Sequence, residues 1–263
     1  PQLHAMVCKY IDLYIRDEMP GYEEKSARFR YLFGRLRTTA EDIVDRMAEE
    51  LAESDFKPVA FELGFGGRDG TLPAITIQEG DATLSVSGKV DRVDGWLHDG
   101  KLYLRVVDYK TGRKSFDLSD VRYGLGIQML LYLFTLEKEG QSCFGYPIVP
   151  AGVLYHPARD LILKAERDIS PEALRRAMDR ELRRDGMVLG DPEVLRAMEH
   201  SALEAPCFLP IQVSKDGGIS GGVATAAQLG RLGQYVEKLL HQITRELRQG
   251  NIDADPCWRG PQE

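Results

Sequence analysis

Apolar residues near the N-terminus recur at helical spacing. This pattern predicts helices over residues 4–16 and 24–36. Thr38 or Thr39, each with an acid three residues on, forms a capping-box pattern, and the apolar positions after it predict a third helix that ends near Ser54. The first part of the chain is therefore expected to be helical.

The pattern then changes to extended runs rich in valine, leucine and aromatic residues, bounded by glycine and aspartate. Four such runs predict consecutive strands of one sheet: 58–65, 72–78, 83–94 and 101–109. Residues 121–138 are apolar nearly all round, which predicts a helix buried against that sheet.

Beyond this helix, residues 151–156 and 160–166 predict two more strands. Ser170 and Pro171 supply an N-cap and a first helical residue, so a helix is expected to open there. The last long helix is expected to stop at Gly250. Its apolar stripe consists of Leu229, Leu232, Val236, Leu239, Leu240, Ile243 and Leu247.

This order of elements predicts an α/β fold with a central mixed sheet flanked by helices, in one domain over residues 1–263. We divide it into N-terminal helices over 1–56, a sheet with the buried helix over 57–166, and a C-terminal helical part over 167–263. The chain begins at Pro1 rather than at Met and ends without a polar tail. We therefore expect it to be a piece of a longer protein.

The formal net charge of −7 argues against a protein that coats nucleic acid by bulk electrostatics, but it leaves room for a local cationic groove. Five arginines gather in one part of the chain: Arg175, Arg176, Arg180, Arg183 and Arg184. A solvated helix face is the simpler interpretation of this cluster. No apolar run reaches the roughly 18 to 20 residues of a membrane span, and no signal-peptide pattern opens the chain, so a cytoplasmic location is expected.

The four cysteines, Cys8, Cys143, Cys207 and Cys257, lie far apart and form no C-x-x-C pair. Neither a zinc site nor a disulfide framework is indicated by this spacing. We expect four reduced thiols that serve mainly in packing.

The hairpin around Asp99 and Gly100 carries the candidate chemistry. This dipeptide between two strand-like runs predicts a two-residue type I′ turn, which sets the register of the two strands. Counting outward from the turn pairs Trp96 with Tyr103, Asp94 with Arg105, and Asp91 with Asp108. The pair Asp94 and Arg105 is explained by a surface ion pair.

Asp91 opposite Asp108 places two carboxylates against each other, a repulsion that a divalent cation would relieve. Because side chains alternate along a strand, Asp91, Asp108 and Lys110 project from one face. Arg92, Asp94, Arg105 and Val107 project from the other. Mg²⁺ or Mn²⁺ takes oxygen ligands, and a nearby lysine can balance charge on a phosphoryl group. The residues therefore predict metal-dependent phosphodiester hydrolysis, with solvated strand-end acids as the alternative.

Three segments in order, GKVDRVDGW (88–96), VVDYKTG (106–112) and GLGIQMLLY (124–132), resemble the RecB-type branch of the PD-(D/E)XK nucleases. The chain is similar to the C-terminal nuclease domains of the B subunits (AddB, or RexB) of bacterial AddAB helicase-nucleases. His4 near the start, PVAFELGF (58–65) and residues 187–198 extend the likeness over essentially the whole chain. The resemblance implies a restriction-endonuclease-like fold and a DNA exonuclease that acts in double-strand break processing and recombinational repair.

The same resemblance implies roles for individual residues. Asp91 and Asp108 become metal ligands, joined by the backbone carbonyl of Tyr109 and by His4 from the first helix. Lys110 becomes the catalytic lysine. Two further residues, Gln128 and Tyr132, lie four apart on one helix face and would steady the substrate strand or the lysine. A hydrogen-bonded core glutamine and a packed tyrosine are the alternative, and Glu62 is left outside the catalytic set.

Relatives also carry an iron-sulfur cluster, held by one cysteine upstream of the nuclease core and three closely spaced cysteines beyond it. Cys257 stands alone here. We therefore expect such a cluster, if the parent protein has one, to lie outside this chain.

The resemblance also implies partners. A helicase would feed single-stranded or end-processed DNA to the site, an AddA-type subunit would be the protein partner, and the strand ending 5′ would be cut. No membrane is implied. Two other interpretations stay open at this point: a catalytically silent scaffold that binds DNA or a neighbouring protein of the assembly, and a stand-alone exonuclease.

Overall fold

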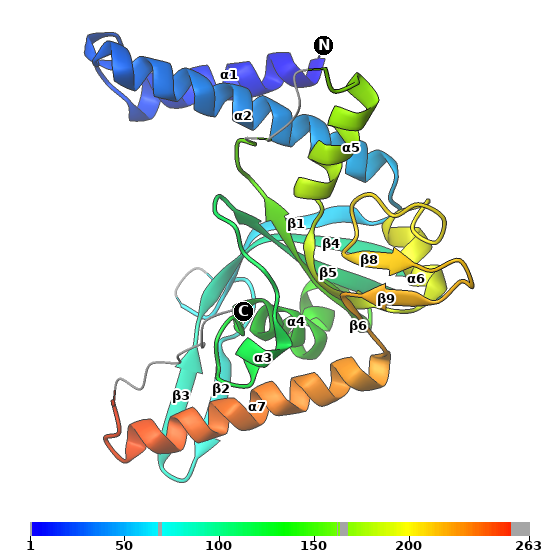
Figure 1. Ribbon diagram of the computed structural model, residues 1–263. Coiled ribbons are helices and arrows are strands. Elements are labelled where there is room, and N and C mark those ends of the chain that lie inside the picture. The colour runs from blue at the N-terminus through cyan, green and yellow to red at the C-terminus, as the bar shows by residue number, and fades with distance from the viewer. Residues whose placement is uncertain (1, 68–69, 162, 164–167, 254–263) are drawn as a thin grey trace.

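A six-stranded sheet forms the centre of the computed structural model, which describes residues 2–67, 70–161, 163 and 168–253 (Figure 1). In spatial order its strands are β1 (Lys57–Phe65), β4 (Gly88–His98), β5 (Lys101–Lys110), β6 (Ile148–Pro157), β7 (Asp185–Leu189) and β10 (Val223–Ala224). The pairs β1–β4, β4–β5 and β6–β7 are antiparallel, whereas β5–β6 and β7–β10 are parallel. The predicted α/β fold with a central mixed sheet is confirmed.

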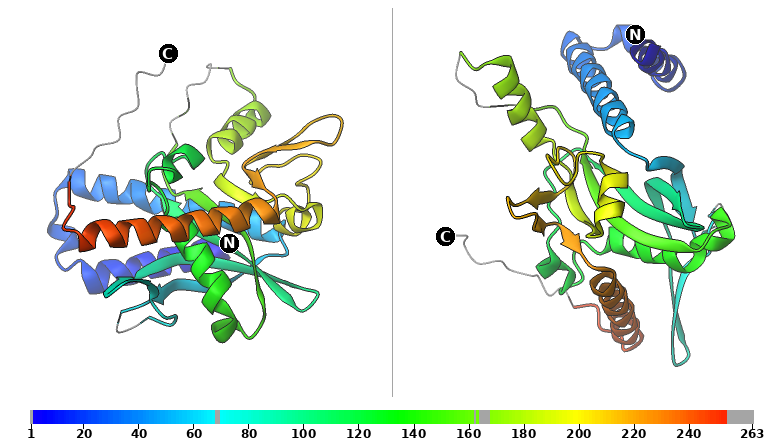
Figure 2. Two further views of the ribbon diagram at one scale, coloured as in Figure 1. Left: turned by 90° about the horizontal axis from the view of Figure 1, so that it is seen from below. Right: turned by 90° about the vertical axis from the view of Figure 1, so that its right-hand side faces the viewer.

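Helices lie on both sides of this sheet (Figure 2). On one side, α4 (Gln128–Phe144) packs against β5 and β6, and α7 (Ala226–Arg248) packs beside α4. On the other side, α1 (Gln2–Glu18) and α2 (Ala27–Ala52) form a hairpin near α5 (Pro171–Glu181) (Figure 1). The shorter elements are a 3₁₀ turn (Tyr22–Glu24), α3 (Leu118–Val121), α6 (Pro192–Met198), β8 (Ile211–Val213) and β9 (Ile219–Gly221).

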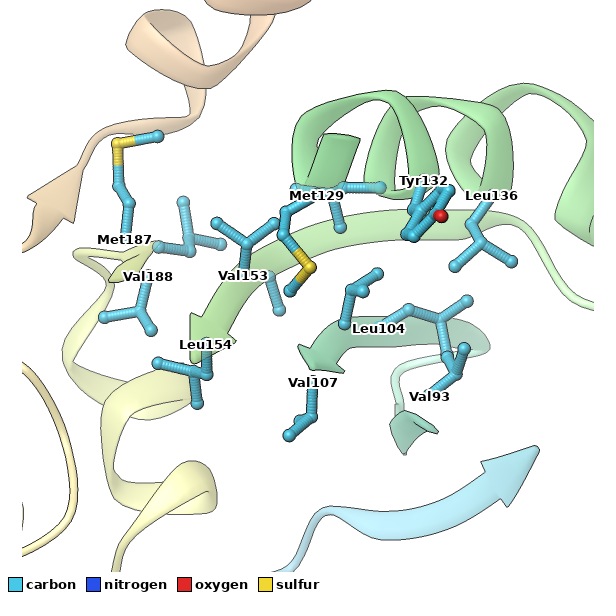
Figure 3. Packing of buried hydrophobic residues seen from close by; sticks show 14 of the residues in the cluster. Val93, Leu104, Val107, Met129, Tyr132, Leu136, Val153, Leu154, Met187 and Val188 are labelled. Carbon is cyan, nitrogen blue, oxygen red and sulfur yellow. The ribbon is translucent and has the colours of Figure 1, made fainter. Parts of the chain in front are cut away.

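Apolar side chains fill the space between the sheet and α4. Val93, Leu104 and Val153 meet Met129 and Leu136 of α4 in this layer (Figure 3). Strand residues at alternating positions, such as Val107 and Leu154, point to the opposite side of the sheet (Figure 3). Both sides of the sheet are thus buried, as expected for a sheet covered by helices on two faces.

Two helical predictions need correction. The N-terminal region holds one long α2, capped by Ser26, rather than two helices with a boundary at Thr38 or Thr39. The hydroxyls of these threonines donate to backbone carbonyls one turn earlier, at 3.4 and 3.0 Å, so both residues are tolerated within the helix. The second correction is that the buried helix predicted over 121–138 begins only at Gln128.

Glycines explain where α4 begins. Gly124 and Gly126 have φ values of 75° and 67°, in the left-handed region that favours glycine, so the chain turns between α3 and α4. This turn places Gln128 at the first position of α4. The predicted burial of the helix is confirmed along most of its length by residues such as Leu130, Leu133 and Leu136.

The sheet also differs from the prediction. Residues 83–94 form parts of two strands, because β3 (Ala82–Val86) pairs with β2 (Ile75–Glu79) in a separate hairpin packed against α7. Of the strand predicted over 160–166, only residues 160, 161 and 163 are described, and none of them is in a strand.

The part over 167–263 contains the predicted helices, with the Ser170 cap and the long α7, but it is not only helical. Its strands β7 and β10 complete the central sheet. A short buried strand such as β7 has no alternation of polar and apolar residues, and periodicity cannot distinguish it from a piece of helix.

None of the helices in the described part of the chain is long and apolar enough to cross a membrane. Among the same residues, Cys8, Cys143 and Cys207 are free thiols, and Cys257 lies outside the described residues.

Candidate active site

The β4–β5 hairpin has the register expected from its turn. Asp99 and Gly100 have φ values of 48° and 70°, the positive pair that a type I′ turn requires. The strand pairs follow from this turn: Trp96 with Tyr103, Asp94 with Arg105, and Arg92 with Val107. Asp91 and Asp108 stand at the next position, just beyond the regular pairing.

The two acids lie on the sheet face that α4 covers. Asp91 Oδ2 accepts a hydrogen bond from the backbone N–H of Tyr109 at 3.0 Å, which ties it to β5. Asp108 is 6% exposed. Burial raises the pKa of Asp108, Lys110 lowers it, and the charge of Asp91 raises it further. The two carboxylates are therefore close enough to repel each other.

Lys110 partly offsets this repulsion. Its ammonium group forms an ion pair with Asp108 Oδ2, and it lies 5.6 Å from the centre of the Tyr155 ring, a cation–π contact. The buried Asp108 Oδ2 has no hydrogen bond of normal geometry. Lys110 pairs with Asp108, so the negative charge of Asp91 is left without a cation from these three residues.

A cavity of about 600 Å³ opens beside Lys110. Gln128 and Tyr155 line it together with the glycine turn before α4 and with the loop after β5, which carries Arg113 and Lys114. The structure therefore brings Lys110 and Gln128, 18 positions apart in the sequence, to one cavity next to the acid pair.

Gln128 is oriented by Tyr132. The Gln128 side-chain amide donates to the Tyr132 hydroxyl at 2.7 Å, and the Tyr132 ring packs edge-on against Phe65, with centroids 5.2 Å apart. Gly88 makes room for both rings, because a Cβ there would lie 2.7 Å from Phe65 and 3.1 Å from Tyr132. Tyr132 is buried and does not line the cavity, so it contacts the site through Gln128.

His4 does not join the acid pair in this structure. Its ring Nε2 lies 2.7 Å from Asp45 of α2, and the side chain is about half exposed. Within the described ranges, no group of three or more histidine, cysteine, aspartate or glutamate residues is arranged to hold a metal ion. Glu62, which lies outside the predicted catalytic set, forms an ion pair with Lys89 at 2.7 Å.

On the other face of the same hairpin lies a buried ion network that the sequence pattern did not reveal. Asp94 and Arg105 are fully buried, so the expected surface ion pair is wrong. Asp94 contacts Arg92 at 2.8 Å and Arg105 at 2.9 Å. The network also contains Glu50 of α2, which lies 2.6 Å from Arg184 and 3.2 Å from Arg105.

The charges of this network are strongly coupled. Burial alone would raise the pKa of Glu50, but Arg184, Arg105 and Arg92 together lower it to about 2. Burial and the charge of Arg184 lower the pKa of His156 to about 2, so this histidine is neutral. The sequence did hold one signal for this network, since Arg92, Asp94 and Arg105 stand within apolar strand runs. Only the fold shows that Glu50 of α2 contacts these residues.

Tyr109 connects the two faces. Its hydroxyl accepts a hydrogen bond from Arg92 at 3.1 Å, and its backbone N–H donates to Asp91. Tyr109 also stands between Asp108 and Lys110 in the sequence. The buried network therefore holds Tyr109 in place, and Tyr109 in turn fixes Asp91 through its backbone N–H.

The donor atoms of the acid pair suit a hard divalent cation. Asp91 keeps one carboxylate oxygen beyond the bond from Tyr109, and the buried Asp108 carboxylate, paired with Lys110, is near enough to feel the charge of Asp91. Mg²⁺ is commonly held by one or two carboxylates together with substrate phosphate, so two acids are sufficient.

Known proteins resemble this chain over most of its length. A family model described as the PD-(D/E)XK nuclease superfamily matches residues 5–259. The B subunit of the ATP-dependent helicase/deoxyribonuclease of Acetivibrio thermocellus is 36% identical over 234 residues, which cover 88% of this chain and 20% of that protein. Proteins of the same name from Clostridium botulinum strain Hall (33% identical; 94% of this chain, 22% of that protein) and Caldanaerobacter subterraneus (33%; 91% and 21%) are also similar. The chain spans about one fifth of the length of these relatives.

Proposed function

Because the chain belongs to the PD-(D/E)XK nuclease superfamily, we propose that it hydrolyses phosphodiester bonds of DNA with the help of Mg²⁺ or Mn²⁺. One observation carries this proposal: Asp91, Asp108 and Lys110 meet on one face of the β4–β5 hairpin, beside a cavity that also contains Gln128.

Each residue has a chemical role in this proposal. Asp91 and Asp108, with the backbone carbonyl of Tyr109, would hold the metal ion, which when bound supplies an activated water and stabilises charge on the phosphate. Hydrolysis joins the water oxygen to phosphorus and breaks the ester bond. Lys110 stabilises the negative charge that develops on the phosphoryl oxygens. Gln128, held by Tyr132, orients the substrate strand in the cavity.

His4 is left out of the proposed ligand set, since it is engaged by Asp45. An active enzyme is favoured over a silent scaffold, because a scaffold would gain nothing from a buried acid that is repelled by its neighbour.

We further propose that the chain is the nuclease domain from the B subunit of a helicase-nuclease that processes DNA ends for recombinational repair. The names of its relatives support this. In such an assembly an AddA-type subunit would be the partner, and helicase action would deliver a single strand to the site. A stand-alone exonuclease is the second candidate.

A cleavage assay tests the proposal. The purified chain is incubated with end-labelled single-stranded DNA, with Mn²⁺, with Mg²⁺ and with chelator. We expect shortened products only when metal is present. A folded chain that binds DNA but leaves it intact with both metals would instead support the silent scaffold.

A further inference from the structure

A second cavity, of about 260 Å³, is lined by the loop that follows β5 together with Arg159, Glu181 and Arg183. It shares Lys110, Arg113, Lys114 and Tyr155 with the cavity that contains Gln128. The two cavities therefore border the same loop and the same lysine. A strand whose scissile phosphate lies at Lys110 has room to continue past this loop.

The smaller cavity is cationic, although the whole chain is acidic. Its lining contains five basic side chains and two acidic ones: Lys110, Arg113, Lys114, Arg159, Arg183, Glu181 and Asp185. A local excess of positive charge in a chain of net charge −7 calls for an anionic partner.

The acids in this cavity do not neutralise its basic residues. Arg113 and Arg159 share a single carboxylate, that of Glu181, at 3.2 and 3.5 Å. Lys114 forms no ion pair with any residue that the structure describes. The ammonium of Lys114 is thus available to a ligand.

Arg183 adds a charge that is held in place. Its guanidinium donates to the backbone carbonyls of Pro206, at 2.7 Å, and Ile211, at 3.4 Å. Carbonyl groups orient a guanidinium but carry no net charge, so Arg183 remains fully positive in the cavity wall. By contrast, Arg184 next to it is buried and bound to Glu50.

We infer that this smaller cavity binds a backbone phosphate of the DNA strand, next to the scissile phosphate, through Lys114, Arg159 and Arg183. The inference rests on the proposed function and extends it to a second contact with the substrate. Because only the phosphate is contacted, the site favours no base sequence.

The test measures binding of a fluorescent oligothymidylate to the whole chain in chelator, where no cleavage occurs, over a range of salt concentrations. Each phosphate contact with a single strand contributes about −0.7 to the slope of log K against log salt. We expect Lys114→Ala and Arg159→Ala each to make this slope shallower, and the double variant to make it shallower by about 0.7, because both residues contact the same phosphate. Lys114 is exposed, so its variant keeps the fold.

Arg175→Ala is the matched control. Arg175 is an exposed arginine of α5 that pairs with Glu49 at 3.1 Å and lies outside both cavities. Its variant should retain the slope of the parent. An equal change in slope for Arg175→Ala would overturn the inference, because binding would then be spread over the surface.

A second measurement locates the contact. Oligonucleotides that carry one neutral methylphosphonate are cleaved in Mn²⁺, with the neutral position moved along the strand. When the neutral methylphosphonate stands at one position next to the cut, the KM of the parent should rise. The KM of Lys114→Ala should stay unchanged, because this variant has already lost the phosphate contact.

The two proposals can fail separately. Unchanged slopes for both Lys114→Ala and Arg159→Ala, in a parent that cleaves DNA, would remove the phosphate site and leave the nuclease function intact. If the parent does not cleave DNA but the two variants change the slope as expected, the phosphate site stands and the proposed nuclease function fails.

Discussion

The two faces of the β4–β5 hairpin use aspartate in opposite ways. One face carries the buried ion network and is called the network face here; on it, Asp94 is fully buried between Arg92 and Arg105. On the α4 face, Lys110 forms an ion pair with Asp108, while Asp91 interacts only at longer range with Lys89, which is paired with Glu62, among the residues that the structure describes. The side chains come from the same two strands and point to opposite faces of the hairpin.

The difference lies in what neutralises each carboxylate. Where arginines outnumber acids, as they do around Asp94 and Glu50, the carboxylates are satisfied inside the protein and hold α2 to the sheet. Where acids outnumber the cation, the remaining charge is directed at a ligand. Stability and binding capacity thus belong to opposite faces of the same two strands, with Asp94 and Asp91 three positions apart on β4.

The largest effect is expected on catalysis. Asp108→Ala and Lys110→Ala should each reduce DNA cleavage by at least about a thousandfold, equivalent to roughly 4 kcal/mol in the activation free energy. Both should keep the parent's circular dichroism spectrum, because neither side chain fills the apolar core. Unfolding of either variant under conditions where the parent is folded would show that the α4 face is structural as well.

Asp94→Ala tests the network face and should act on stability. It leaves Arg92 and Arg105 buried with only Glu50 as their acid, so the free energy of unfolding should fall by about 3–5 kcal/mol. Denaturant unfolding measures the change. Asp12→Ala is the control, since Asp12 forms an exposed ion pair with Arg37 and should cost less than about 1 kcal/mol. Equal losses for the two variants would contradict the comparison.

Because His156 is buried in its neutral form, the free energy of unfolding should depend on pH. Its folded pKa of about 2 is below the ordinary value of 6.5, so the unfolded chain takes up this proton first and stability falls as pH decreases below 6.5. From about pH 7.5 to about pH 5.5, this one group should lower the free energy of unfolding by about 1.4 kcal/mol. His156→Gln should lose less stability than the parent over the same interval. Identical losses would show that His156 is not buried in its neutral form.

The smallest effect concerns the acid pair without metal. The pKa of Asp108 is raised mainly by burial, so its ionised form destabilises the folded chain at neutral pH and this cost disappears as pH falls. Asp108→Asn should therefore unfold at a higher temperature than the parent in chelator near neutral pH, by the equivalent of about 1 kcal/mol. Manganese should raise the melting temperature of the parent alone. A variant that melts lower than the parent and still responds to manganese would falsify the acid-pair site.

Local patterns were sufficient where the chemistry is local. The Asp99–Gly100 turn set the register of β4 and β5, and alternation then placed Asp91, Asp108 and Lys110 on one face. The cap at Ser170 and most of the apolar stripe of α7 were equally clear, because caps and helical spacing depend on residues close in sequence; Leu247, at the end of the stripe, is exposed.

The same local patterns did not predict contacts between segments that are distant in sequence. Periodicity did not show that Asp94 is buried, because the network around its partners Arg92 and Arg105 is completed by Glu50 of α2 and by Arg184, just before β7. It did not separate the β2–β3 hairpin from the central sheet or add β7 and β10 to it. The family resemblance also predicted a position for His4 beside the acids, whereas the structure pairs His4 with Asp45.

Sequence by itself therefore determined the α/β class, the β4–β5 register and the acid pair with its lysine, since each depends on spacing along one or two neighbouring elements. Only the tertiary structure decided which charges are neutralised inside the protein and which face a cavity. Pairing of a buried charge depends on segments that meet only after folding: Asp94 is buried between two arginines, whereas Asp108 is buried beside Lys110 and is repelled by Asp91.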